Sequence, residues 1–184
     1  MTAEVEAAGQ PSIYPMAPLI RFTLISLYLA LVLPLPVLAP AELVPWLMLA
    51  LVLGLVLVLA LTSEQVRLDA AGISVAHPAW CSWLLRRGWS LRFEQIAGLT
   101  PVGTSQGGRV FYVRQQGGGA YLLPQRIARF EIFVQRFGAA ASLDMAGVGR
   151  LTPPWTYQLL AVLCALMLLG ELAWWRLGAG LIAA

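Results

Sequence analysis

The sequence has no lysine, and its nine acidic and twelve basic residues make up only 11% of the 184 positions. That is less than half of the charged share of ordinary soluble domains. It has two cysteines, Cys81 and Cys164. Because neither has another thiol nearby in the sequence, we expect no disulfide framework and no cysteine-based metal site. The one histidine, His77, has no partner at metal-binding spacing, so we expect it to be structural or exposed.

Motifs for catalysis and nucleotide binding are also lacking. No intact P-loop, dinucleotide-binding, zinc or nucleophile-elbow pattern occurs. The glycine-rich stretches at residues 103–108 and 117–119 do not stand between a strand and a helix, as a phosphate loop requires. The net charge of +3 is typical of a membrane protein with cytoplasmic arginines. We therefore expect no enzymatic activity, no cofactor and no nucleic-acid partner.

What the sequence has instead is three long apolar runs, at residues 22–38, 43–61 and 155–175. Runs of about 17–25 apolar residues can cross the ~30 Å hydrocarbon core of a bilayer. We predict a transmembrane helical hairpin at residues 20–62, with a tight proline-rich turn from Leu33 to Pro45, and a third transmembrane helix at residues 155–176. The remaining ends are predicted to be a flexible N-terminal segment at residues 1–19 and a short tail at residues 177–184.

Arginine placement predicts the orientation in the membrane. The hairpin turn has no arginine, whereas ten of the twelve lie between residues 63 and 152. By the positive-inside rule, the N-terminus and the segment between the second and third spans are expected to be cytoplasmic. The C-terminus is then on the opposite side of an inner or thylakoid membrane.

Glu171 is a carboxylate inside the third apolar run. An acidic residue within a span can mark an ion path. However, Glu171 stands close to Trp174, Trp175 and Arg176, which together are typical of an interfacial anchor. We expect it to lie at headgroup level or to pair with Arg176. Because the span interiors hold no other ionisable residue, a transporter or pump is not favoured.

The segment between the second and third spans has the pattern of antiparallel strands followed by a helix. Strands are predicted at residues 66–69, 73–76, 82–85, 89–93, 99–102, 109–114 and 120–123. The apolar period then becomes helical, at Ile127, Phe130, Phe133, Val134 and Phe137. Pro124 suits a first helical turn and Gly138 suits an end. The fold class predicted is a three-span α-helical membrane protein with a small antiparallel β domain, residues 63–141, closed by a helix at residues 124–138 and followed by a linker at residues 142–154.

This order resembles the bacterial pleckstrin-homology-like (PH-like) family, which occurs in many small membrane proteins. The resemblance rests on residues 66–75, 84–96 and 122–124. The second of these stretches ends in a four-residue pattern, namely an aromatic residue, an acidic residue, any residue and isoleucine. It implies a PH-like fold that binds proteins or lipid headgroups. The whole layout also looks like that of uncharacterised proteins of photosynthetic bacteria, which makes photosynthesis one expected setting. The photosystem I assembly protein family has a related layout but lacks the third span.

Two groups of residues are candidate contacts for lipid or a partner. The first is Arg86 and Arg87 with Trp83 and Trp89, a combination that suits a membrane interface; the alternative is a tryptophan core with solvated arginines. The second is a basic stripe on the helix made by Arg126, Arg129 and Arg136; the alternative is an ordinary solvated face.

The sequence thus predicts a non-catalytic, membrane-anchored interaction module. It would assist the assembly, stability or regulation of a larger integral membrane protein complex. The alternative prediction is a membrane protein that senses anionic lipid through its PH-like domain.

Overall fold

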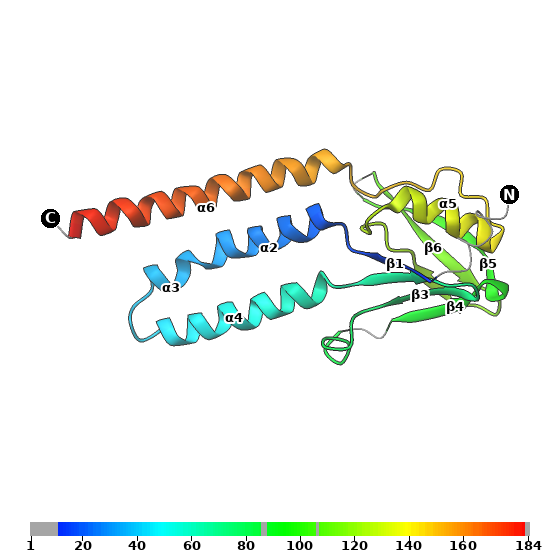
Figure 1. Cartoon of the computed structure of the whole chain (residues 1–184), viewed down its shortest axis with the longest axis horizontal. Coiled ribbons are helices and arrows are strands. Elements are labelled where there is room, and N and C mark those ends of the chain that lie inside the picture. Colours follow the sequence, from blue (N-terminus) through cyan, green and yellow to red (C-terminus); the bar gives the residue numbers. More distant parts are fainter. Residues whose placement is uncertain (1–10, 86–87, 106, 183–184) are drawn as a thin grey trace. The chain divides into compact units, whose positions relative to one another are not determined.

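The computed structural model describes residues 11–85, 88–105 and 107–182, with residues 178–182 described by their backbone alone. The chain forms two compact units (Figure 1). The first, called the β unit here, combines Met1–Ala17 with Ser63–Thr152. The second, called the span unit, combines Pro18–Thr62 with Pro153–Ala184.

The span unit consists of four helices, α2 (Pro18–Val32), α3 (Pro34–Leu38), α4 (Val44–Leu61) and α6 (Pro154–Ile182). Helix α2 packs against both α4 and α6 (Figure 1). Three helical stretches are long and apolar enough to cross a membrane, namely Pro18–Leu38, Val44–Leu61 and Pro154–Leu177. The prediction of three helices long and apolar enough to cross a membrane is confirmed. The predicted tail at residues 177–184 is wrong in part, because α6 continues to Ile182.

The turn of the hairpin is shorter than predicted. Leu33 still donates its backbone N–H to the Leu29 carbonyl at 2.9 Å, and α3 begins directly at Pro34. Proline is tolerated in a first helical turn because its missing N–H would have no partner there. Helical structure therefore continues through Pro34 and Pro36 to Leu38, so the turn does not begin at Leu33 as predicted but lies between α3 and α4.

A tyrosine and a glycine hold the hairpin helices close together. The Tyr28 hydroxyl of α2 donates to the Leu51 carbonyl of α4 at 2.7 Å. The side chain reaches this carbonyl over Gly54, where a Cβ atom would collide with the Tyr28 ring and hydroxyl. Gly54 therefore provides room for a polar contact between two otherwise apolar helices.

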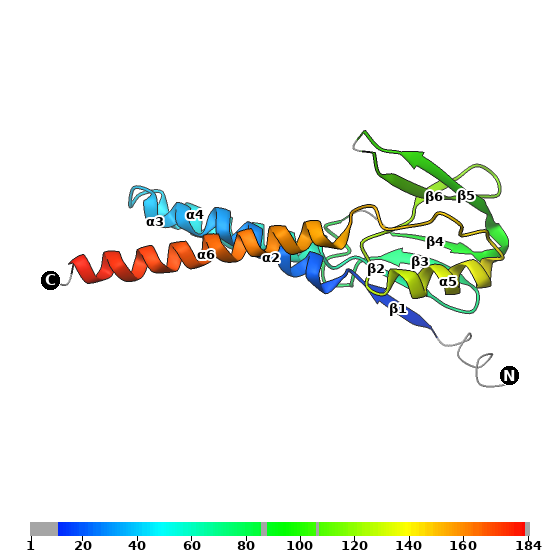
Figure 2. The same ribbon diagram turned by 90° about the horizontal axis from the view of Figure 1, so that it is seen from above.

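The β unit contains two antiparallel sheets. The four-stranded sheet has the order β1 (Ser12–Pro15), β2 (Gln65–Leu68), β3 (Gly72–Ala76) and β4 (Trp89–Arg92). A short 3₁₀ turn, η1 (Phe93–Gln95), leads into the three-stranded sheet of β5 (Ile96–Gly103), β6 (Arg109–Gln115) and β7 (Ala120–Leu122). Figure 2 shows the β5–β6 hairpin splayed away from β3 and β4. The prediction of antiparallel strands followed by a helix is confirmed.

The N-terminal segment differs from the prediction. Residues 1–19 were expected to be flexible, but Ser12–Pro15 forms the edge strand β1 and pairs with β2. Within β1, Tyr14 is 5% exposed and its ring packs edge-on against Phe133 at 5.4 Å between centroids, whereas Ile13 is 54% exposed. The strand thus has one buried and one open face. Strand β2, which begins fifty positions after Pro15, pairs with this segment and orders it. The local sequence does not indicate this pairing.

The helix that closes the β unit also begins later than predicted. Helix α5 covers Phe130–Ala141 rather than residues 124–138. The preceding backbone pairs with the N-terminal segment instead: Ala128 donates to the Pro15 carbonyl at 2.8 Å, and the Arg126 carbonyl accepts from Ala17 at 2.8 Å. Arg129 then adopts a left-handed conformation with φ of 53°, so no helix can continue back through it.

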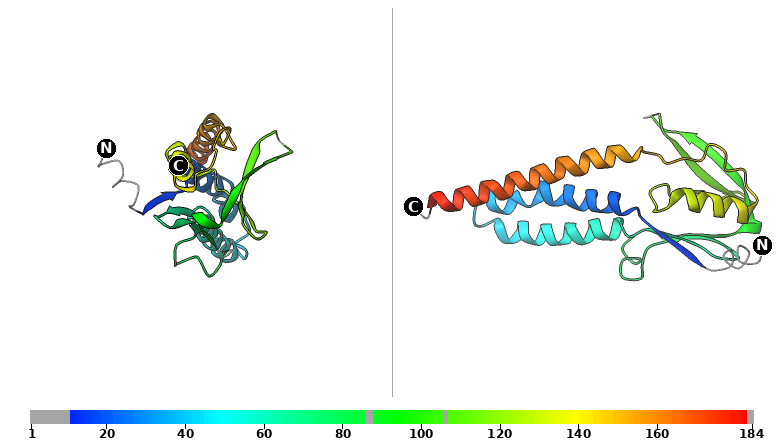
Figure 3. Two further views of the ribbon diagram at one scale, coloured as in Figure 1. Left: turned by 90° about the vertical axis from the view of Figure 1, so that its right-hand side faces the viewer. Right: turned by 45° about the horizontal axis from the view of Figure 1, so that its top comes forward.

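Helix α5 packs on the inner faces of both sheets (Figure 3, right). Its apolar stripe, Phe130, Phe133 and Phe137, is at most 2% exposed. Gly138 does not end the helix, as predicted. It lies inside α5, where the Met145 side chain occupies the space that a Cβ atom would fill, and the helix ends at Ser142 in a left-handed cap.

The strand predicted at residues 82–85 is wrong. Residues 79–84 form consecutive turns, in which the N–H groups of Cys81 and Ser82 both donate to the Pro78 carbonyl, at 3.1 and 3.0 Å. These backbone groups are satisfied locally, so they are not available to a sheet. Residues 77–85 therefore form a structured loop.

Candidate functional site

One end of the four-stranded sheet is joined directly to the membrane helices. Strand β1 ends at Pro15, three positions before α2 begins, and β2 begins at Gln65, four positions after α4 ends. Pro15 pairs with Gln65, and Gln65 with Ala76. We call this the span-side end of the β unit. The opposite end carries the β2–β3 turn, in which Asp69 accepts hydrogen bonds from Ala71 and Gly72.

The loop that follows β3 at the span-side end, residues 77–85, exposes large apolar side chains. Trp80 is 51% exposed, Trp83 79% and Leu84 48%. The backbone beneath them is held by the turn bonds to Pro78 and by those from Leu84 and Leu85 to the Cys81 carbonyl, at 3.1 and 3.3 Å. The Trp83 indole N–H donates to the Trp80 carbonyl at 2.9 Å. The loop thus has a hydrogen-bonded backbone and three exposed apolar side chains.

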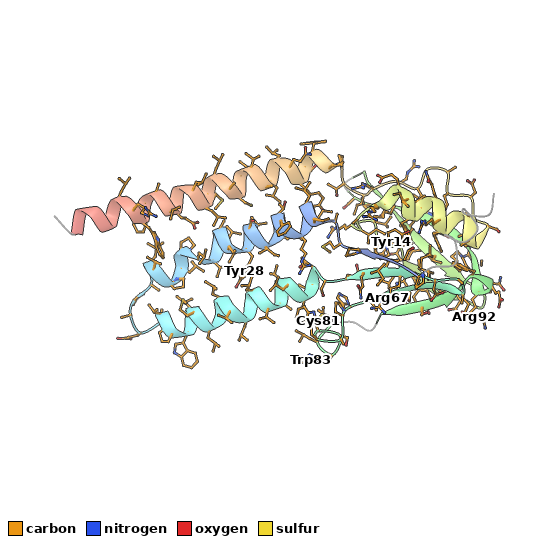
Figure 4. The ribbon with its side chains drawn as sticks, viewed as in Figure 1. Tyr14, Tyr28, Arg67, Cys81, Trp83 and Arg92 are labelled. Atoms are coloured by element: carbon orange, nitrogen blue, oxygen red, sulfur yellow. The ribbon has the colours of Figure 1, made fainter. Side chains whose placement is uncertain are left out.

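Cys81 fastens this loop to the chain that leaves α4. Its side chain is 1% exposed, and its Sγ atom lies 3.2 Å from the Oγ atom of Ser63. Ser63 is two positions after the last residue of α4. Figure 4 shows Cys81 and Trp83 together at this end of the β unit, with Arg92 at the other end.

A partly buried carboxylate lies beside the same loop. Burial raises the pKa of Glu64 above its usual value, and the nearby charges of His77 and Arg126 oppose that rise. The Nδ1 atom of His77 is buried and has no hydrogen-bond partner within the described structure. Glu64, His77 and Arg126 therefore form an electrostatically linked group at the point where the chain enters the span-side end.

The three arginines predicted to form a helical stripe are spread along the β unit. Arg126 precedes α5 and is tied by its carbonyl to Ala17, at the span-side end. Arg129 occupies the left-handed N-cap of α5. Arg136 donates to the Ser12 hydroxyl at 2.8 Å, and Ser12 pairs with Leu68 at the opposite end of β1. Of the three, Arg126 is bonded directly to the span-side end through its own carbonyl.

The other predicted contact residues are divided between loop and core. Trp83 stands out from the loop. Trp89 pairs with Val75 in the sheet and stacks on Tyr121 with 5.3 Å between ring centroids, so the structure places its ring against the core. Arg86 and Arg87 lie outside the described residues.

In the span unit, Glu171 lines an apolar groove. The groove has a volume of about 350 Å³ and is lined by Leu33, Pro34, Leu168, Glu171, Leu172 and Trp175. A smaller hollow of about 190 Å³ continues it along Val37, Leu38 and Trp174. The ion pairs among the described residues are Arg92–Glu94 and Arg150–Glu131. Of the two predicted alternatives for Glu171, the pairing with Arg176 is therefore not formed, and a position at headgroup level stays a prediction. Glu171 instead lies at the level of α3, where the first span ends.

Sequence reasoning considered Trp80 beside Trp83 and Trp89, but it overlooked the exposure of Leu84 and the contacts of Cys81 and Glu64. Trp80, Trp83 and Leu84 have helical spacing directly after Pro78, and this spacing was the available signal that the segment is a turn and not a strand. The positions of Cys81 and Glu64 depend on contacts that the local pattern does not show. Among the described residues, no three His, Cys, Asp or Glu side chains gather as metal ligands.

The chain has a relative in a cyanobacterium. A protein of Synechocystis sp. (strain ATCC 27184 / PCC 6803 / Kazusa), named "Uncharacterized protein slr0269", is 38% identical over 167 residues, which make up 88% of this chain and 84% of the relative. No protein-family model and no solved structure matches the chain.

Proposed function

The chain belongs to the family of this Synechocystis protein, and we propose that it is a non-catalytic, membrane-anchored interaction module. In this proposal it assists the assembly, stability or regulation of a larger integral membrane protein complex. The supporting observation is the groove between α3 and α6, which combines apolar walls with the single carboxylate of Glu171.

The groove suits a helix of a partner protein. Helix–helix association within a bilayer depends on close packing and on polar groups that find partners across the interface. A carboxylate in an apolar hollow favours a partner side chain that donates hydrogen bonds or carries positive charge, because such a pair satisfies both groups at once. The partner in this proposal therefore has a membrane helix with an Arg, Lys or amide side chain near its end.

We also propose a PH-like fold for the β unit and a cytoplasmic location for it, in an inner or thylakoid membrane. Two antiparallel sheets with one amphipathic helix packed on both support the fold proposal. The concentration of arginines in this unit supports the cytoplasmic side.

The test is purification of the tagged full-length protein from its native membrane in a mild detergent. We expect a near-stoichiometric integral membrane complex, whose abundance falls when the protein is deleted. Glu171→Gln should reduce the recovered partner. Glu42→Gln is the matched control, because Glu42 is an exposed carboxylate in the turn between α3 and α4. Recovery of the protein alone, or equal effects of the two substitutions, would contradict the proposal.

The second candidate function is anionic-lipid sensing. It is favoured by Arg126, an exposed arginine whose backbone is pinned to Ala17, the residue directly before the first span. A cation near an anionic surface contributes about 1 kcal/mol. In liposomes, enrichment of anionic lipid around the protein should then fall with salt and with Arg126→Gln, and should not change with Arg136→Gln at the opposite end.

A further inference from the structure

The loop at the span-side end is exposed to solvent although it is largely apolar. From Ala79 to Leu85 it contains no charged residue, and Trp83 shows 79% of its surface. Two tryptophans and a leucine standing out together form an apolar patch of the kind that marks an interaction surface. The backbone of the loop is held by turn hydrogen bonds, and the three side chains are exposed and do not pack onto the sheet.

A short stretch of chain and one side-chain contact link this loop to the end of α4. Ser63 is two positions after the last residue of α4, so it lies within about 7 Å of the end of that helix. Cys81 contacts Ser63 at 3.2 Å, and Trp80 and Trp83 are one and two positions from Cys81. The polar headgroup layer on each side of the hydrocarbon core is itself about 5–7 Å thick. Covalent linkage and one side-chain contact thus limit how far the loop can lie from the end of α4, where the headgroup layer is expected.

The chemistry of the loop fits the boundary between headgroups and hydrocarbon. Tryptophan is enriched there because its ring is apolar and its indole N–H is polar. In Trp83 the N–H is already bonded to the Trp80 carbonyl at 2.9 Å, so the ring can enter an apolar layer without leaving a donor unpaired.

We propose that residues 78–85 insert Trp80, Trp83 and Leu84 into the headgroup–hydrocarbon boundary of the same bilayer that holds the spans. The insertion gives the β unit a second attachment to the membrane besides its chain connections. It requires neither a protein partner nor anionic lipid, so it goes beyond the function proposed above and can stand or fall independently of it.

The experiment uses the full chain in proteoliposomes of zwitterionic phosphatidylcholine. Cys164 is replaced by Ala, and a polarity-sensitive fluorophore is attached at Ser82→Cys, an exposed loop position. The matched control is Gln116→Cys, also exposed but at the opposite end, where the Gln116 N–H bonds to the Gln95 carbonyl at 2.7 Å. Lipids with a nitroxide high on the acyl chain quench the fluorophore on contact.

We expect the label at position 82 to be quenched severalfold more strongly than the label at position 116, and to be unaffected by high salt. Trp80→Ser with Trp83→Ser should reduce this difference while Cys81 stays protected from thiol reagents, which shows that the loop is still folded. Equal quenching at the two positions would overturn the proposal, as would unchanged quenching in the tryptophan variant. If the patch binds a protein instead, pure lipid gives no such difference.

Discussion

The edge strand β1 can be tested by comparing two neighbouring residues on its opposite faces. Tyr14 is 5% exposed and contacts the Phe133 ring, whereas Ile13 is 54% exposed. Both residues lie in the same four-residue strand, so replacing either one by Ala removes a side chain that favours strands. What differs between Tyr14→Ala and Ile13→Ala is the loss of buried volume.

The size of this difference follows from the packing. Replacing a buried aromatic residue by Ala typically lowers the free energy of unfolding by about 3–5 kcal/mol, because apolar contacts are lost and a cavity remains. A change at an exposed position usually stays within about 0.5 kcal/mol. For a domain of this size, each 1 kcal/mol shifts the melting temperature by roughly 4 °C. Tyr14→Ala should therefore lower it by more than about 10 °C, and Ile13→Ala by about 2 °C.

Cys81 provides a reporter for the β unit within the full-length protein. Its thiol is 1% exposed, so we expect it to react with a fluorogenic maleimide only when the unit opens. With Cys164→Ala as background, a temperature ramp in detergent records unfolding of the β unit alone. Tyr14→Phe keeps the ring and should behave nearly as wild type. If Tyr14→Ala and Ile13→Ala shift the transition equally, β1 is not packed as described and the reasoning is refuted.

Two further predictions concern carboxylates. Burial raises the pKa of Glu64, so the Glu64 carboxyl holds its proton more tightly in the folded unit than in the unfolded chain. The free energy of unfolding therefore falls as the pH rises from about 4.3 through the raised value. Glu64→Gln should raise the melting temperature measured by circular dichroism at pH 7, and this gain should vanish near pH 4. Glu131 accepts two hydrogen bonds from Arg150 at 2.9 and 3.0 Å, and these bonds lower the pKa of Glu131. The stabilisation that the pair gives the fold is therefore present above about pH 4.3 and is lost as the pH falls through the lowered pKa. A double-mutant cycle with Glu131→Gln and Arg150→Gln should give a coupling of about 0.2–1 kcal/mol at pH 7, whereas no coupling at pH 7 would show that the pair contributes nothing.

The three membrane helices could be predicted because the bilayer imposes a length and a composition on each span. The β2–β3 hairpin could be predicted for a local reason as well. Its turn is closed by Asp69, whose carboxylate accepts from the N–H groups two and three positions later, and the strands on either side alternate in burial.

The features that were missed depend on contacts distant in the sequence. Strand β1 has no partner within fifty residues, because the whole hairpin lies between it and β2. The start of α5 is set by the same segment, since Pro15 and Ala17 take up the backbone groups that a helix at residues 124–129 would have used. The position of Glu171 beside α3 likewise depends on helix packing. In each case the local sequence pattern alone does not decide the structure, because a contact with a segment distant in the sequence does.

Strand β1 connects the stability of the two units. The chain between Pro15 and Gln65 contains both helices of the hairpin, and these helices pack against each other. Once α2 and α4 are paired, the chain segments that lead to Pro15 and Gln65 start from adjacent helix ends, so the pairing of β1 with β2 requires little additional loop-closure entropy. The pairing in turn restrains those helix ends from separating. A strand of four residues, too short to be recognised from its own sequence, can therefore stabilise the sheet and the hairpin together.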